Sequence, residues 1–149
     1  YPIKALGGVA VEAAAIGALG LARDRRWMLV DADGRALTQR EVPSLVRFAT
    51  ALVGDDAVRV TAPDGASLEV GAADAGAARR RVGLFADVVE AATFPAGVDA
   101  WFSARVGQPC ALVYLPDDVV RPVDPAYASP DDRAAFADGY PVLVATEAS

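Results

Sequence analysis

Five arginines lie close together in the stretch RDRRWMLVDADGRALTQRE, residues 23–41. A guanidinium group binds a phosphate or a carboxylate through two parallel hydrogen bonds, so a cluster of arginines can form an anion site. The chain as a whole is acidic, with a formal net charge of −6. The cluster is therefore either a set of solubilising charges on a hairpin or, in part, a site aimed at an anion. Its members are Arg23, Arg25, Arg26, Arg35 and Arg40.

The same stretch carries two carboxylates, Asp24 and Asp31, that could act as a general acid and base. Both stand where turns are expected, so we favour a structural role for them. The chain has no histidine, which excludes histidine-activated serine and cysteine nucleophiles and the HExxH zinc site. Cys110 is the single cysteine, which excludes an intramolecular disulfide and a zinc site built on a cysteine pair.

Composition narrows the classes of partner. An isoelectric point of about 4.5 argues against nucleic-acid binding, because phosphate neutralisation needs clustered lysine and arginine. No apolar run approaches the roughly 20 residues that span a bilayer, so we expect no membrane partner and a cytoplasmic location. With 149 residues, 54% of them hydrophobic, the chain is expected to be globular.

The elements that must position these residues are mostly short strands separated by turns. In DADG and in Pro63-Asp64-Gly65, glycine can take the positive φ of a hairpin turn. GVDAWFSARVGQ places apolar residues at helical spacing, and its Gly107 suits a helix end. We therefore predict a mainly β fold, a small β-barrel with one helix. The expected strands are 1–4, 27–30, 36–39, 44–52, the hairpin 58–70, 82–93 (for which a helix is the alternative) and 110–115, and the helix is 97–108.

The pattern changes after residue 115. Residues 116–136 hold four prolines in a polar run, the composition of a linker or a long wrapping loop. FADGYPVLVATEAS then predicts a new apolar strand, and Ser149 resembles the N-cap of a helix that would follow. We expect a barrel domain at 1–115, a linker and the beginning of another domain at 116–149, and a chain that is a piece of a longer protein.

Several motifs in one order carry a family resemblance. YPIK, DRRWMLVDADGRALTQREVPSL, DAWFSARVGQPCALV, RPVDPAYA and FADGYPVLVATEAS together resemble the N-terminal β-barrel domain of MOSC-domain proteins. That group includes the mitochondrial amidoxime-reducing component and its bacterial relatives. The resemblance covers essentially the whole chain, and FADGYPVLVATEAS would be the first strand of a following MOSC domain.

The resemblance implies an oxidoreductase that uses molybdenum cofactor to reduce N-hydroxylated or N-oxygenated small molecules. Electrons would come from an iron–sulfur or flavin protein. The cysteine that ligates molybdenum would lie beyond Ser149, and Cys110 does not occupy its position. Residues 1–149 alone are therefore expected to be inactive and to hold no cofactor.

The resemblance also assigns candidate cofactor-binding residues. Lys4 matches the lysine of the YPxK motif, and Arg25 matches the arginine of the DR motif; both would contact the pterin phosphate. Gly139 and Tyr140 match contacts from the MOSC side. Ala5 stands where relatives have a serine, so one hydroxyl donor is missing.

Each basic candidate also has a structural interpretation. Arg25 could form a salt bridge with Asp24 or Asp31, and Lys4 could be a solvated charge. A charge-assisted hydrogen bond to phosphate contributes about 1.5–3 kcal/mol, so a phosphate role is worth testing.

Two further features leave alternatives open. The run of three arginines at 79–81 is either a solvated turn or a docking patch for an acidic redox partner. Trp27 is expected in the core. For the function as a whole, the alternative is a non-catalytic β-barrel binding or interaction module without metal.

Overall fold

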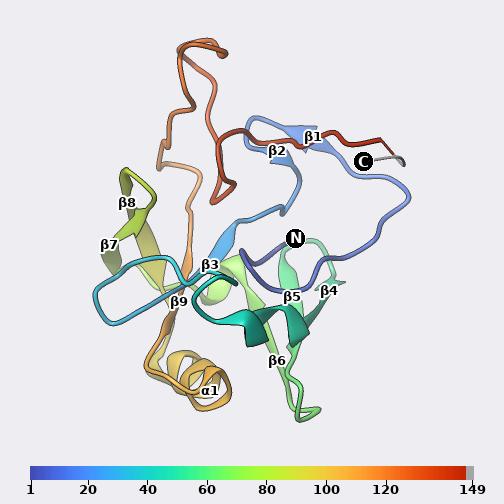
Figure 1. Ribbon diagram of the computed structural model, residues 1–149, viewed down its shortest axis with the longest axis vertical. Coiled ribbons are helices and arrows are strands. Elements are labelled where there is room, and N and C mark those ends of the chain that lie inside the picture. The colour runs from blue at the N-terminus through green and yellow to red at the C-terminus, as the bar shows by residue number, and fades with distance from the viewer. Residues whose placement is uncertain (147–149) are drawn as a thin grey trace.

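The computed structural model describes residues 1–146 and has a mainly β architecture with one α-helix among them (Figure 1). The predicted fold class is confirmed. The strands are β1 (Ile16–Gly17), β2 (Gly20–Leu21), β3 (Trp27–Val30), β4 (Ala49–Val53), β5 (Ala57–Thr61), β6 (Ser67–Gly71), β7 (Arg79–Leu84), β8 (Asp87–Thr93) and β9 (Ala111–Tyr114). The helix is α1 (Ala96–Val106), and short 3-10 turns span Pro43–Arg47 and Ala72–Asp74.

Two antiparallel sheets form the body of the fold. The larger has the strand order β3-β9-β8-β7, and the smaller is the meander β4-β5-β6. β3 and β9 run from the pair Trp27↔Tyr114 to the pair Val30↔Ala111. The strand that closes the larger sheet therefore lies next to the first strand of that sheet.

The four-stranded sheet separates two hydrophobic clusters, because successive side chains of a strand point to opposite faces. Trp27 and Leu29 face the cluster that also contains buried side chains of the meander and of α1. Met28 and Val30 face the second cluster, which Phe136 covers from the far end of the chain. β3 is therefore buried on both sides, with Trp27 in the core as expected.

The helix forms where the sequence predicted it. Gly107 ends α1 with a φ of +86°, and its N–H donates to the Ser103 carbonyl. Such a left-handed residue after the last turn suits glycine, which has no Cβ. Phe102, on the inner face of α1, is completely buried.

Residues 82–93 form neither one strand nor a helix. They lie within the hairpin of β7 and β8, and Phe85 and Ala86 are the two residues between the paired Leu84 and Asp87. Phe85 has a φ of +56°, a conformation that glycine, asparagine and aspartate favour in such turns. The turn lacked these signals, which is why the sequence did not predict it.

The strand expected at 44–52 begins only at Ala49. Pro43 opens a 3-10 turn instead, and the buried Leu45 and Phe48 lie three residues apart, which is a helical spacing rather than a strand spacing. At 36–39 the contact with β3 is limited to the bridge Val30↔Ala36 and the hydrogen bond from the Leu37 N–H to the Leu29 carbonyl. In the first residues, the predicted strand 1–4 is reduced to the bridge Ile3↔Trp27.

Within residues 136–146, which the structure describes, no strand forms. The segment passes beside β1 and β2 (Figure 1), where Pro141 lies against Gly20. A strand needs a partner for its backbone groups, and residues 141–146 form no ladder with one. The proposed N-cap at Ser149 lies outside the described residues.

Candidate functional site

The first residues of the chain lie against the segment that precedes β3. The Arg25 N–H donates to the Tyr1 carbonyl at 2.7 Å, and the Lys4 N–H donates to the Trp27 carbonyl at 2.8 Å. These backbone bonds place Lys4 and Arg25, which are 21 positions apart in sequence, at the same end of β3.

A third segment, residues 134–138, joins them. The Phe136 N–H donates to the Arg25 carbonyl at 2.9 Å. Arg121 holds the same segment, because its guanidinium donates to the carbonyls of Ala135, Ala137 and Asp138 at 2.9, 2.6 and 2.8 Å. Three parts of the sequence thus meet at one cluster.

The contact between Lys4 and Asp138 lies at the centre of this cluster. The Lys4 Nζ is 2.5 Å from the Asp138 Oδ1, and the two side chains are 8% and 77% exposed. Burial lowers the pKa of Lys4, and the Asp138 carboxylate partly offsets this. The hydrogen bond from Lys4 is the main cause that lowers the pKa of Asp138. The pair therefore joins a buried ammonium to a carboxylate that water reaches.

Arg25 forms a salt bridge with Asp24, as its structural interpretation predicts. Its Nη1 lies 2.5 Å from the Asp24 carboxylate, and its guanidinium lies 5.3 Å from the Tyr1 ring centroid. Arg25 has a φ of +49° and precedes β3, so strand alternation does not set its direction. Its side chain remains 25% exposed.

The other two predicted site residues follow Asp138 directly. A Cβ on Gly139 would meet no atom within 4 Å, and Tyr140 is 39% exposed. The structure brings Lys4, Arg25 and Asp138 together, but gives no contact between Tyr140 and Lys4 or Arg25 among the described residues.

Of the remaining arginines in residues 23–41, Arg23 and Arg26 form hydrogen bonds or ion pairs, whereas Arg35 and Arg40 are exposed. Arg23 donates to the Gly54 carbonyl at 2.7 Å, and Arg26 pairs with Asp117 at 2.8 Å. Asp31 accepts the N–H of Arg35 at 2.8 Å, which fits its predicted turn role.

The three arginines at 79–81 differ in their contacts. Arg80 donates to the Ala32 carbonyl at 2.6 Å and thereby holds the loop after β3. Arg79 lies 3.6 Å from Asp118. Arg81 is exposed.

Three residues of the site were not among the candidates from the sequence. Arg121 is 3% exposed, yet its proline-rich surroundings indicated only a linker. Phe85 lies over Lys4, with 5.3 Å from its ring centroid to Nζ, but nothing in VGLFADVV marks it. Asp138 has no local signal either, because its link to Lys4 spans 134 positions.

Cys110 lies apart from the cluster. It is buried, and burial raises the pKa of its thiol. The Ser103 hydroxyl donates to the Cys110 carbonyl and accepts from its N–H, at 2.9 and 3.0 Å. Within residues 1–146, no three His, Cys, Asp or Glu side chains are grouped so that they could hold a metal ion.

The chain is similar in sequence to known proteins of one family. Residues 1–109 match the sequence model of the MOSC N-terminal beta barrel domain. The chain is 28% identical to mitochondrial amidoxime-reducing component 1 of Danio rerio over all of its own length and 48% of that protein. It is 27% identical to a molybdenum cofactor sulfurase of Solanum lycopersicum over 76% of the chain and 14% of that protein. The chain thus spans half or less of these relatives.

A shorter match reaches higher identity, 42% over 67 residues, with mitochondrial amidoxime reducing component 2 of Bos taurus, covering 42% of the chain and 20% of that protein. A solution structure from Bordetella bronchiseptica shares the fold, with a TM-score of 0.53 and 19% identity over 73% of this chain and 92% of that one. Among the described residues, no helix combines the length and apolar character needed to cross a membrane.

Proposed function

This chain belongs to the family of MOSC N-terminal β-barrel domains, and we propose that it is the N-terminal part of a molybdenum-cofactor oxidoreductase. The full-length protein would reduce N-hydroxylated or N-oxygenated small molecules. The relatives named as amidoxime-reducing components support the substrate class. In this proposal residues 1–115 form the barrel domain, and residues 116–149 form a linker and the beginning of the MOSC domain.

One observation carries the proposed role of the barrel: a buried lysine amine whose counter-charge is an exposed carboxylate. Lys4 is held within the fold, whereas the Asp138 carboxylate is 77% exposed and lies on a segment without regular structure. A phosphate monoester carries close to two negative charges and offers more acceptors than one carboxylate. We expect it to displace Asp138 from Lys4.

The residues fit a phosphate on chemical grounds. Lys4 would supply a point charge, and Arg25 would supply a planar fork after releasing Asp24. Ala5, where relatives have a serine, offers no hydroxyl; it has a φ of +68°, and its carbonyl accepts the Gln39 amide at 2.7 Å. Gly139 and Tyr140 would approach the same group from the following segment.

When bound, the cofactor supplies the oxygen-atom chemistry. The chain's own residues orient the phosphate, neutralise its charge and exclude water from one side of it. Residues 1–149 alone would then be inactive, and an iron–sulfur or flavin protein would donate the electrons to the complete cytoplasmic enzyme.

A second candidate function is supported by the way the basic groups are paired. Lys4 and Arg25 already have carboxylate partners, as expected of a purely structural cluster. A non-catalytic binding module would need no phosphate at either residue.

The decisive experiment compares molybdenum and pterin content per chain in the full-length protein and in Lys4→Met and Arg25→Ala variants, expressed in a cofactor-competent host. Arg79→Ala is the matched control, because Arg79 has only a 3.6 Å ion pair with an exposed aspartate. We expect near-stoichiometric cofactor in the parent and control, and a loss of at least about fivefold in both variants.

Reduction of an aromatic amidoxime with an artificial electron donor completes the test. Full cofactor in all variants would restrict Lys4 and Arg25 to structural roles. Absence of molybdenum and of reductase activity in the folded parent would leave the binding module as the better account.

A further inference from the structure

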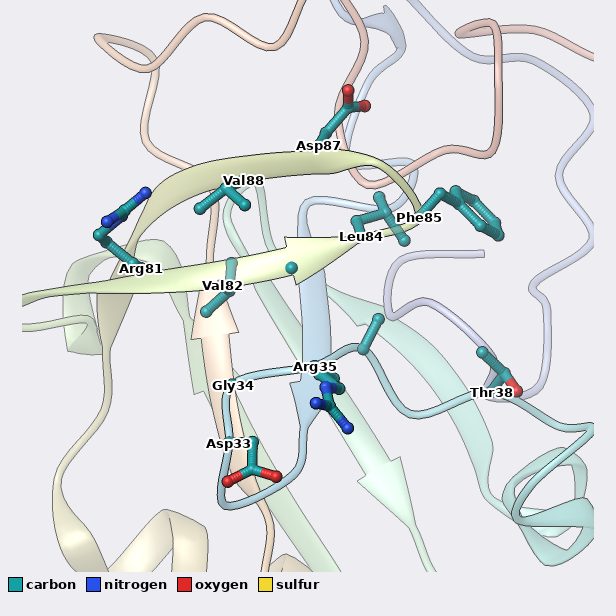
Figure 2. A pocket seen from close by; sticks show the side chains of 12 residues that line it. Asp33, Gly34, Arg35, Thr38, Arg81, Val82, Leu84, Phe85, Asp87 and Val88 are labelled. Carbon is teal, nitrogen blue, oxygen red and sulfur yellow. The ribbon is translucent and has the colours of Figure 1, made fainter.

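A groove lies on the outer face of the β7–β8 hairpin, bordered by the loop that follows β3 (Figure 2). Its volume is about 540 Å³. The loop runs alongside β7, because the Gly83 N–H donates to the Gly34 carbonyl at 2.8 Å and the Ala36 N–H donates to the Gly83 carbonyl at 2.9 Å. Backbone hydrogen bonds between the loop and β7 therefore close the base of the groove.

The base of the groove is a glycine. Arg35 pairs with Gly83 on one side, and Gly83 pairs with Val88 on the other. Paired residues of neighbouring strands point to the same face, so Arg35 and Val88 flank a position that has no side chain. A Cβ built on Gly83 would meet no atom within 4 Å. The space above Gly83 is thus open and shaped by the missing side chain.

Apolar side chains form one part of the rim. Phe85 and Val88 are 69% and 57% exposed; Figure 2 shows Val88 between the two strands and Phe85 projecting from the turn of the hairpin. Phe85 is held outward by the turn, where its φ is +56°. A flat apolar group over Gly83 would cover carbon surface on both of these residues, which favours its binding.

Two guanidinium groups supply the charge. Arg35 and Arg81 are both exposed, and neither side chain has a hydrogen-bond or ion-pair partner among residues 1–146. Arg81 lies two positions before Gly83, about 7 Å along the strand.

The nearby carboxylates neutralise the positive charge of the two arginines only in part. Asp87 is engaged by Arg121, whose Nε lies 2.7 Å from its Oδ2. Glu90 is the cross-strand neighbour of Arg81, yet the structure gives no ion pair between them within the described residues. Asp33 is exposed at the loop end of the groove. At the Gly83 end, the unpaired guanidinium groups of Arg35 and Arg81 favour the binding of an anion.

We propose that this groove, the Gly83 groove, binds a small anion with a flat apolar body, such as an aryl carboxylate. The ring would lie over Gly83 against Phe85 and Val88, and the carboxylate would accept hydrogen bonds from Arg35 and Arg81. The inference does not depend on the proposed cofactor role, since Lys4 does not line the groove.

The test measures binding of benzoate to the full-length protein by ligand-observed NMR, with acetate and benzamide as probes that each lack one half of the recognised chemistry. We expect benzoate to bind at least about fivefold more tightly than either. Gly83→Val should remove benzoate binding by filling the groove. Gly97→Val is the matched control, because a Cβ there also meets no atom within 4 Å and Gly97 lies outside the groove.

Arg35→Gln and Arg81→Gln give an independent readout that leaves the strands unchanged. Each should weaken benzoate binding at least about tenfold, as expected for loss of one charge-assisted contact. The proposal is overturned if benzoate does not bind, if acetate binds equally well, if Gly83→Val binds like the parent, or if Lys4→Met alone abolishes binding.

Discussion

The Nζ of Lys4 and the Oδ1 of Asp138 lie 2.5 Å apart across 134 positions of sequence, with the lysine buried and the aspartate exposed. The lysine cannot leave the interior without breaking the packing at the start of β3. The aspartate lies at the surface, where water reaches its carboxylate. The two partners should therefore respond differently to substitution.

Asp138→Asn should destabilise the protein by about 1–2 kcal/mol, because it leaves a buried ammonium with a weaker, neutral acceptor. Urea denaturation measures this change. Asp118→Asn is the control, since Asp118 is similarly exposed but its partner Arg79 is 35% exposed; it should change stability by less than about 0.5 kcal/mol. Equal effects of the two substitutions would show that burial of Lys4 does not matter.

The same pair predicts a pH dependence on the acid side. The pKa of Asp138 in the folded protein is lower than in the unfolded chain, about 3.9. Its contribution is therefore complete above the unfolded value and is lost as pH falls through the folded value. Stability of the parent should decline more steeply below about pH 4 than that of Asp138→Asn, as urea titrations at successive pH values would show. Parallel curves would contradict the prediction.

Arg121→Met should destabilise the protein by about 3 kcal/mol or more. The substitution leaves three carbonyls, those of Ala135, Ala137 and Asp138, without their buried donor. Arg79→Met removes a half-exposed arginine and serves as the control, with an expected change below about 0.5 kcal/mol. Thermal or urea unfolding would separate the two, and a mild effect at Arg121 would mean that water replaces its bonds.

Gly34→Ala should cost more stability than Gly65→Ala. Both glycines have φ values above +80°, so alanine is strained at either position. At Gly34 the new Cβ would also meet the Arg81 carbonyl at 2.9 Å, whereas at Gly65 it meets no atom within 4 Å. We expect about 1 kcal/mol at Gly65 and about 2 kcal/mol or more at Gly34. Equal losses would show that the loop can move away from β7.

Local patterns were sufficient for much of this fold. The helix ending at Gly107 and the turn at Gly65 depend on residues that lie next to each other in sequence, so the sequence predicted them. The turn at Phe85 was missed because an aromatic side chain occupies a position that usually requires glycine. The 3-10 turn after Pro43 was missed because an apolar run of that length suits a strand equally well.

The candidate site was predicted only in part, for a related reason. The family resemblance singled out Lys4 and Arg25, and the structure brings them together. Lys4 meets Asp138, and Arg25 meets Phe136, across more than 100 positions, for which the sequence has no local signal. The phosphate role of both basic residues stays a prediction.

The pairing of β3 with β9 also bears on how the chain is made. Trp27 finds its partner Tyr114 only after 87 further residues have been added, whereas the β4-β5-β6 meander closes through contacts within about 20 residues. During synthesis on the ribosome the meander can form early, but the larger sheet cannot be completed until β9 has emerged. Contacts of such sequence separation slow folding, and until then the apolar β3 would expose side chains and an unpaired edge, which favour aggregation.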